Sequence, residues 1–214
     1  MIVPTMTVQE IHNEVFEDIK NIEKIMNGFN KDFRKLVLRK SRYPLTKTYE
    51  YITKEKNNLF IIGYTALKRS DWDNPVMHFY GIYTRPEGKY AVAPSIDMNM
   101  STIYPPHFFK RYRERIVKDD TISNDDIIRL YFMNDWGFTG AKVNQDHENV
   151  YHSFEDSDKN DRIDIVAATN QGYCFGVKQG NINIIKTIMS EDMLFKNQKF
   201  RSEEHTSELQ SRFG

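Results

Sequence analysis

The sequence has very little cysteine, with Cys174 alone among 214 residues, and it has no apolar run long enough to cross a membrane. One thiol cannot form an intramolecular disulfide, which argues against a disulfide-bonded secreted scaffold and favours a reducing compartment. A membrane-spanning helix needs about 20 mostly apolar residues. The first residues also lack the basic start and apolar block of a signal peptide. We therefore expect a soluble cytoplasmic protein with no membrane partner.

An excess of charge of one sign is also absent, because 30 basic side chains balance 30 acidic ones. The charges are unevenly distributed, however: residues 31–42 and 110–118 are rich in lysine and arginine, whereas 146–164 are dominated by Asp and Glu. A near-neutral total does not exclude a polyanionic partner when basic residues cluster in this way. Hydrophobic residues make up 39% of the chain, which is enough for a packed core.

The end of the chain has an unusual composition. The segment RSEEHTSELQS, from Arg201 onward, resembles the in-frame translation of a common short-read sequencing adapter. Segments of such origin say nothing about a fold. We therefore expect residues 201–214 to be a sequencing artefact rather than native protein.

The first part of the chain predicts helices. Residues 7–27 have apolar side chains at helical spacing, with Thr7 as the N-cap, and Gly28 is expected to end this helix. Two further helices are expected, a basic one over 30–41 and a short one over 46–56. The sequence thus predicts a helical lead-in over residues 1–57.

From Asn58 onward the pattern changes to short runs rich in β-branched and aromatic residues, which are typical of strands. These runs cover 59–67, 75–84, 89–94, 161–169, 172–178 and 181–189. Tight-turn residues separate the last three, so we expect them to form an antiparallel meander.

Between the two groups of strands, the sequence predicts one helix over about 106–118 and another that begins after Ser123, followed by a long exposed loop over 137–161. The predicted class is α+β, with N-terminal helices followed by a mostly antiparallel sheet with two central helices. The α+β domain is expected to span residues 58–200.

The helix over 106–118 carries the clearest functional pattern. His107, Arg111 and Arg115 recur every fourth residue, so they share one face of a helix. Pro106 suits the first helical position, which places His107 in the first turn, where the helix dipole disfavours imidazole protonation and favours an anion. A neutral histidine beside a phosphate can take the proton of a ribose 2′-hydroxyl, while arginines neutralise charge in the transition state. This chemistry needs no metal and no cofactor.

The same pattern fits a helix face that is simply solvated. Glu114 can pair with Arg111 or with Lys110, and His107 can hydrogen-bond a loop. Both interpretations remain open from the residues alone.

The segment PHFFKRYRERIVKDDTISNDDIIRLY resembles the histidine-containing helix, with the pattern HxLxRxxER, of small toxin-like domains in the barnase, EndoU, colicin and RelE-like ribonuclease superfamily. The order of a helix followed by an antiparallel meander is similar too, over roughly residues 100–195. The resemblance implies metal-independent RNA cleavage through a 2′,3′-cyclic phosphate, with His107 as general base or acid and Arg111 and Arg115 on the phosphate. It implies RNA as a partner and leaves room for a cognate inhibitor protein.

The resemblance also implies a basic residue or a threonine in a late strand, where this chain has Lys186 and Thr187. Because successive side chains of a strand point to opposite faces, only one of the two can face the site without a bulge. We choose Thr187 as the catalytic partner, since Lys186 would otherwise join Ile182 and Ile184 on the buried face. The residues expected to bind the substrate are Lys110, Lys186 and Tyr112.

The chain departs from a minimal toxin in its 57-residue lead-in and its three additional strands. Two alternatives therefore stay open: a non-catalytic module that binds nucleic acid through residues 31–42 and 110–118, and an accessory protein of a phage or mobile element.

A metal site is not expected. The acidic loop around His147 and His152 contains oxygen and imidazole ligands, but the spacing of its histidines and the absence of an EF-hand pattern favour a solvated loop. Such a loop could cover the basic helix in the resting protein. Cys174 and His78, both within predicted strands, are expected to be packed side chains.

Overall fold

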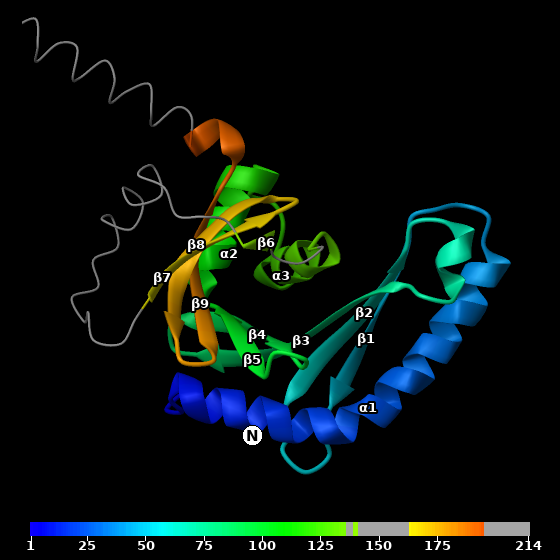
Figure 1. Ribbon diagram of the computed structural model, residues 1–214, viewed down its shortest axis with the longest axis horizontal. Coiled ribbons are helices and arrows are strands. Elements are labelled where there is room, and N and C mark those ends of the chain that lie inside the picture. The colour runs from blue at the N-terminus through cyan, green and yellow to red at the C-terminus, as the bar shows by residue number, and fades with distance from the viewer. Residues whose placement is uncertain (136–138, 141–162, 195–214) are drawn as a thin grey trace, which may run out of the picture.

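The computed structural model of the protein describes residues 1–135, 139–140 and 163–194 (Figure 1). The predicted α+β class is confirmed. The adapter-like segment and most of the predicted acidic loop lie outside the described residues. The elements are α1 (Val8–Arg39), β1 (Leu45–Ile52), β2 (Leu59–Ala66), η1 (Arg69–Trp72), β3 (Val76–Arg85), β4 (Gly88–Ser95), β5 (Met100–Tyr104), α2 (Pro106–Tyr112), η2 (Arg113–Val117), α3 (Asn124–Met133), β6 (Thr139–Gly140), β7 (Ile163–Thr169), β8 (Gly172–Gln179) and β9 (Ile182–Met189).

All strands of the described ranges belong to one nine-stranded sheet, in the order β1-β2-β3-β4-β5-β9-β8-β7-β6. Neighbouring strands are antiparallel except β5 and β9, which run parallel, with Ser101 opposite Ile182 and Ile103 opposite Ile184. The predicted meander of β7, β8 and β9 is confirmed. β5 was not predicted, and it is the strand that connects the two halves of the sheet.

The sheet is strongly curved, with α1 along its outer side and α2 and α3 in its hollow (Figure 1). Apolar side chains therefore pack in two main layers. One layer lies between α1 and the sheet, and includes Ile11, Val15, Ile22, Phe33, Val37, Phe60, Ile62 and Val92. The other lies between the sheet and the two central helices, and includes Ile61, Tyr80, Tyr104, Phe108, Tyr112, Ile127, Tyr131, Cys174 and Ile188.

The first helix is longer than predicted. Its predicted N-cap is confirmed, because the Thr7 hydroxyl accepts a hydrogen bond from the Glu10 N–H at 3.2 Å, and the Glu10 carboxylate accepts one from the Thr7 N–H at 2.7 Å, which completes a capping box. The predicted end at Gly28 is wrong: α1 continues to Arg39 and includes the residues of the predicted second helix. Phe33 and Val37, both fully buried, extend its apolar face onto the sheet. Their burial outweighs the cost of about 1 kcal/mol of one glycine inside a helix.

The predicted helix over 46–56 is also wrong. Residues 45–52 form β1, which pairs with β2 along its whole length, from Leu45 opposite Ala66 to Ile52 opposite Leu59. The side chains of Leu45, Tyr49 and Tyr51 pack in the layer under α1. Pairing with a distant strand thus decides the conformation of this segment, as is common for strands.

Gly28 offers a test of the continuous helix. It is exposed, and a Cβ at this position would meet no atom within 4 Å. We therefore expect Gly28→Ala to raise the free energy of unfolding by about 0.5–1 kcal/mol, because alanine loses less backbone entropy in a helix. Urea denaturation followed by circular dichroism measures this change.

Gly180→Ala is the matched control, since Gly180 also has open space around it but has a φ of +56°. This substitution should lower stability by about 1 kcal/mol, because alanine is strained in the left-handed region. A loss of stability in Gly28→Ala would contradict the continuous helix.

Candidate functional site

The helix predicted to carry His107 is present, but its hydrogen-bonding pattern changes from α-helical to π-helical midway. α2 begins with Pro106 at its first position, as predicted, and it gives way after Tyr112 to the π-helical turn η2. The Lys118 N–H donates to the Arg113 carbonyl at 2.7 Å, and Lys118 ends the turn in the left-handed conformation. Isolated π turns inside helices are frequent at functional sites.

The polar side of this helix faces outward. His107, Lys110 and Arg111 are exposed, whereas Phe108 and Phe109 are buried against the sheet. His107 and Arg111, which were predicted to share one face of the helix, therefore both lie on its exposed side.

Glu114 partly neutralises the basic face. Its carboxylate accepts a hydrogen bond from Arg111 Nη1 at 3.0 Å and lies 3.9 Å from Lys110 Nζ. The side chains of both Arg111 and Glu114 are more than one-third exposed. Exposed pairs of this kind contribute about 0–1 kcal/mol, so an incoming anion can displace Glu114 from Arg111 at low cost.

Arg115 differs from its neighbours because it is partly buried and anchored to the sheet. Its Nη1 donates to the Thr187 hydroxyl at 2.8 Å and to the Ile188 carbonyl at 3.1 Å. Burial lowers the pKa of Arg115 and the nearby Arg111 lowers it further, while Glu114 opposes both effects. Arginine nevertheless keeps its charge in proteins.

No carboxylate of the described residues forms an ion pair with Arg115. Both of its hydrogen bonds to the described residues use Nη1, so within that part of the chain Nη2 and Nε carry three further N–H donors. A partly desolvated cation with donors to spare is suited to bind an anion.

A β-bulge sets the position of Thr187. In the pairing of β8 with β9, Phe175 lies opposite Thr187 but the next residue, Gly176, lies opposite Ile185, so Lys186 is the extra residue. The backbones approach closely here, because a Cβ on Gly176 would lie 2.2 Å from the Ile184 carbonyl oxygen. Strict alternation between Lys186 and Thr187 therefore does not hold. Thr187 contacts the predicted helix by accepting a hydrogen bond from Arg115.

Tyr112 lies in the core rather than at the surface. It is 2% exposed, its hydroxyl donates to Gln171 Oε1 at 2.5 Å, and its ring packs edge-on against Tyr131. The Gln171 amide in turn donates to the Tyr131 carbonyl at 3.1 Å. Tyr112 thus fixes α2 to α3 and to the β7–β8 turn, and we do not include it among the residues proposed to bind a substrate.

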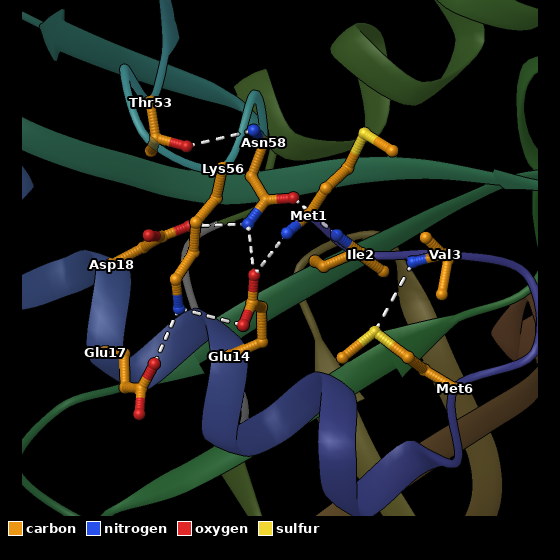
Figure 2. A network of polar contacts seen from close by, with 10 residues as sticks. All are labelled: Met1, Ile2, Val3, Met6, Glu14, Glu17, Asp18, Thr53, Lys56 and Asn58. Atoms are coloured by element: carbon orange, nitrogen blue, oxygen red, sulfur yellow. Dashed lines mark hydrogen bonds and ion pairs between the residues drawn. The ribbon is translucent and has the colours of Figure 1, made fainter.

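A second polar cluster, which the sequence analysis missed, joins α1 to the segment between β1 and β2 (Figure 2). Lys56 Nζ donates to Glu14 at 2.9 Å and to Glu17 at 2.6 Å. The Asn58 amide donates to Asp18 at 2.7 Å and to Glu14 at 3.1 Å. The signal was a carboxylate, Asp18, within the apolar stripe of α1, which indicates a buried polar partner.

The carboxylates of this cluster have opposite pKa shifts. Burial raises the pKa of Glu14, but the hydrogen bonds from Lys56, the Met1 amino group and Asn58 outweigh it and lower the pKa to about 2. Burial raises the pKa of Asp18, and the bond from Asn58 only partly compensates. The cluster therefore holds α1 to the segment between β1 and β2, although burial destabilises the charged form of Asp18. We call it the polar clamp.

Two further histidines are packed. His12 Nδ1 lies 2.8 Å from the Ser101 hydroxyl between α1 and β5, and burial lowers the pKa of His12. His78 is half-buried in β3, where burial also lowers its pKa. Cys174 is fully buried, as expected. Because Ser101 is fully buried as well, the His12–Ser101 pair is closed to a substrate.

Within the described ranges, no three His, Cys, Asp or Glu side chains are grouped as a metal site requires. The candidate loop at His147 and His152 lies outside these ranges. None of the described helices is long and apolar enough to cross a membrane.

Comparisons with known proteins give no match: no family model, no curated protein and no solved structure is similar to this chain. The function must therefore be inferred from the site itself.

The polar clamp predicts a pH-dependent stability. Because the pKa of Glu14 is about 2 in the folded protein, below its ordinary 4.5, Glu14 stabilises the fold above pH 4.5, and this contribution is lost as the pH falls to about 2. We expect Glu14→Gln to lower the free energy of unfolding by about 1–3 kcal/mol at pH 7. The difference from the unmodified protein should close between pH 4.5 and 2. Denaturation curves across this pH range measure it.

Glu17→Gln serves as control, because Glu17 bonds the same lysine but is 65% exposed. Its effect should stay below about 1 kcal/mol at any pH. A Glu14→Gln deficit that is equal at pH 2 and pH 7 would show that the charge of Glu14 is not the cause.

Proposed function

We propose that the protein is a metal-independent, RNA-cleaving nuclease of toxin type that acts in the cytoplasm, with His107, Arg111 and Arg115 as its site. The observation that carries the proposal is the state of Arg115, which is partly buried, bonded to Thr187, and without an ion-pair partner among the described residues.

Arg115 is suited to hold the scissile phosphate. Its two bonds to β9 orient the guanidinium in advance, so little side-chain entropy is lost when an anion binds. The remaining N–H groups match the geometry of two phosphoryl oxygens. Its partial burial lowers the local dielectric and strengthens the attraction to a negative charge.

His107 is the general base of the proposed reaction. It takes the proton of the 2′-hydroxyl, the 2′ oxygen bonds to phosphorus, and the 5′ oxygen leaves with a proton returned by the same imidazole or by solvent. The products are a 2′,3′-cyclic phosphate and a 5′-hydroxyl. Exposure of His107 gives RNA access to the ring. Because α2 has only seven residues, the arginines rather than a helix dipole supply the electrostatic stabilisation.

The alternative of a non-catalytic module that binds nucleic acid relied on residues 31–42 and 110–118 as one basic surface. The first stretch lies at the C-terminal end of α1, which packs against η1, the short helix that follows β2. The second stretch lies on α2 and η2, and η2 packs against β9. β1 and β9 are five positions apart in the sheet. The two basic stretches are thus separate surfaces, which favours assigning them separate roles.

The direct test is incubation of purified protein with RNA in the presence of EDTA. We expect cleavage that ends in 2′,3′-cyclic phosphates. His107→Ala should lower the rate about 10²–10⁴-fold, the usual range for loss of a general acid or base. Arg115→Lys should also impair cleavage, because lysine lacks the forked donors. Lys20→Ala, which removes an exposed lysine of α1 outside the proposed site, is the control and should leave the rate unchanged. Intact RNA with the unmodified protein would overturn the proposal.

Thr187 is proposed as a positioning residue that acts through Arg115. Thr187→Val, which removes the hydroxyl but keeps the shape, should lower kcat roughly 10-fold, since the Arg115 guanidinium loses one of its two anchors. Thr187→Ser, which retains the hydroxyl, should restore the rate. Equal rates for the valine and serine variants would mean that the Thr187–Arg115 bond has no part in the reaction.

A further inference from the structure

A second basic surface lies at the C-terminal end of α1. There the helix packs against η1 (Figure 1). We call it the α1–η1 corner and define it by Lys31, Arg34, Lys35, Lys68, Arg69 and Trp72. All of these side chains are exposed except Arg34, which is partly buried. None of them belongs to the site of His107 and Arg115.

Arg34 and Trp72 form the fixed centre of this corner. The Arg34 guanidinium forms an ion pair with Asp73, and its central carbon lies 5.0 Å from the centroid of the Trp72 ring. Such cation–π contacts contribute to holding the ring in place. Trp72 is nevertheless 39% exposed, so part of its ring is open to a second partner.

The acidic residues of the corner are already engaged. Asp73 pairs with Arg34, and Asp71 accepts hydrogen bonds from the N–H groups of Leu67 and Lys68 at 2.8 and 3.0 Å. Asp32 lies 3.9 Å from Lys35. Within the described part of the chain, no ion pair engages Lys31, Lys68 or Arg69. The corner therefore has surplus positive charge around an exposed aromatic ring.

We propose that the α1–η1 corner binds a single-stranded segment of RNA, with a base stacked on Trp72 and adjacent phosphates on Lys68, Arg69 and Lys31. Basic side chains that follow a phosphate backbone, combined with an aromatic ring for stacking, are the combination that single-stranded nucleic acid requires. An acidic peptide would use the charges but not the ring. The inference deepens the proposed function, on which the choice of RNA rests.

In this proposal one RNA molecule contacts both surfaces: the α1–η1 corner binds it, and the site of His107 and Arg115 cleaves it. η1 packs beside β2, which lies four strand spacings of about 4.8 Å from β9, so the corner is roughly 20 Å from Arg115 along the sheet. A segment that reaches both surfaces gains affinity from the linkage between them. The corner would thus favour long single-stranded substrates over short ones.

The test measures binding to a single-stranded 2′-O-methyl RNA oligonucleotide of mixed sequence, which cannot be cleaved through a 2′-hydroxyl. Trp72→Leu should weaken binding about 10-fold, within the range found for loss of one stacked base. Trp72→Phe should retain much of the affinity, because the phenyl ring still stacks. Circular dichroism verifies that both variants are folded.

A second variant tests the charges without touching the ring. Lys68→Gln combined with Arg69→Gln should lower the slope of log affinity against log salt by about 1.4, at about 0.7 for each phosphate contact with a single strand. The matched control is Lys20→Gln with Lys54→Gln, two exposed lysines outside the corner, which should leave the slope unchanged.

Unchanged affinity in Trp72→Leu together with an unchanged slope in the double variant would overturn the proposal. The proposal would also be overturned if an acidic peptide bound as tightly as the oligonucleotide, competed with it, and lost affinity in the same variants. These outcomes differ from those expected if only the nuclease proposal fails. In that case RNA with free 2′-hydroxyls would remain intact, while the oligonucleotide would still bind through Trp72.

Discussion

The parallel pairing of β5 with β9 is the constraint on which the rest of the structure depends. It joins an N-terminal antiparallel group, β1 to β5, to the C-terminal meander, and it makes one curved sheet of both. Parallel neighbours need a long connection, and the chain between β5 and β9 contains α2, η2 and α3 followed by β6, β7 and β8. Because α2 follows β5 directly, the helix lies over the neighbouring β9. The contact of Arg115 with Thr187 is a consequence of this pairing.

The two sides of the sheet are stabilised in different ways. In the hollow, aromatic rings hold the crossover helices, and Tyr104 lies 5.1 Å from Phe108 and 5.3 Å from Tyr131 between ring centroids. On the outer side, α1 combines an apolar stripe with the polar clamp at Glu14 and Asp18. The clamp fixes the N-terminal part of α1, and the apolar contacts of Phe33 and Val37 fix its C-terminal part. Both proposed RNA-contacting surfaces are thus built on helices that pack against the rest of the fold, which favours precise positioning of their side chains.

Local patterns predicted the elements that local interactions dominate. The Thr7 capping box, Pro106 at the start of α2, the Ser123 cap of α3 and the tight turns of the meander were all readable, because each involves residues a few positions apart. The same patterns failed at Gly28 and at β1, where long-range packing prevails over local preference. The face of α2 that carries His107 and Arg111 was predictable because helical periodicity alone sets it.

The sequence by itself therefore determined the class of the fold, the caps and turns, and the shared face of His107 and Arg111, since these follow from short-range periodicity and backbone preferences. Only the tertiary structure decided that Arg115 reaches Thr187, that Lys186 forms the bulge, that Tyr112 is buried and that Trp72 stacks on Arg34. Each of these depends on strands or helices far apart in the chain, and no local pattern encodes which of them become neighbours. The physical reason is that burial rewards whichever distant apolar surfaces fit together, and this fit is a property of the whole chain.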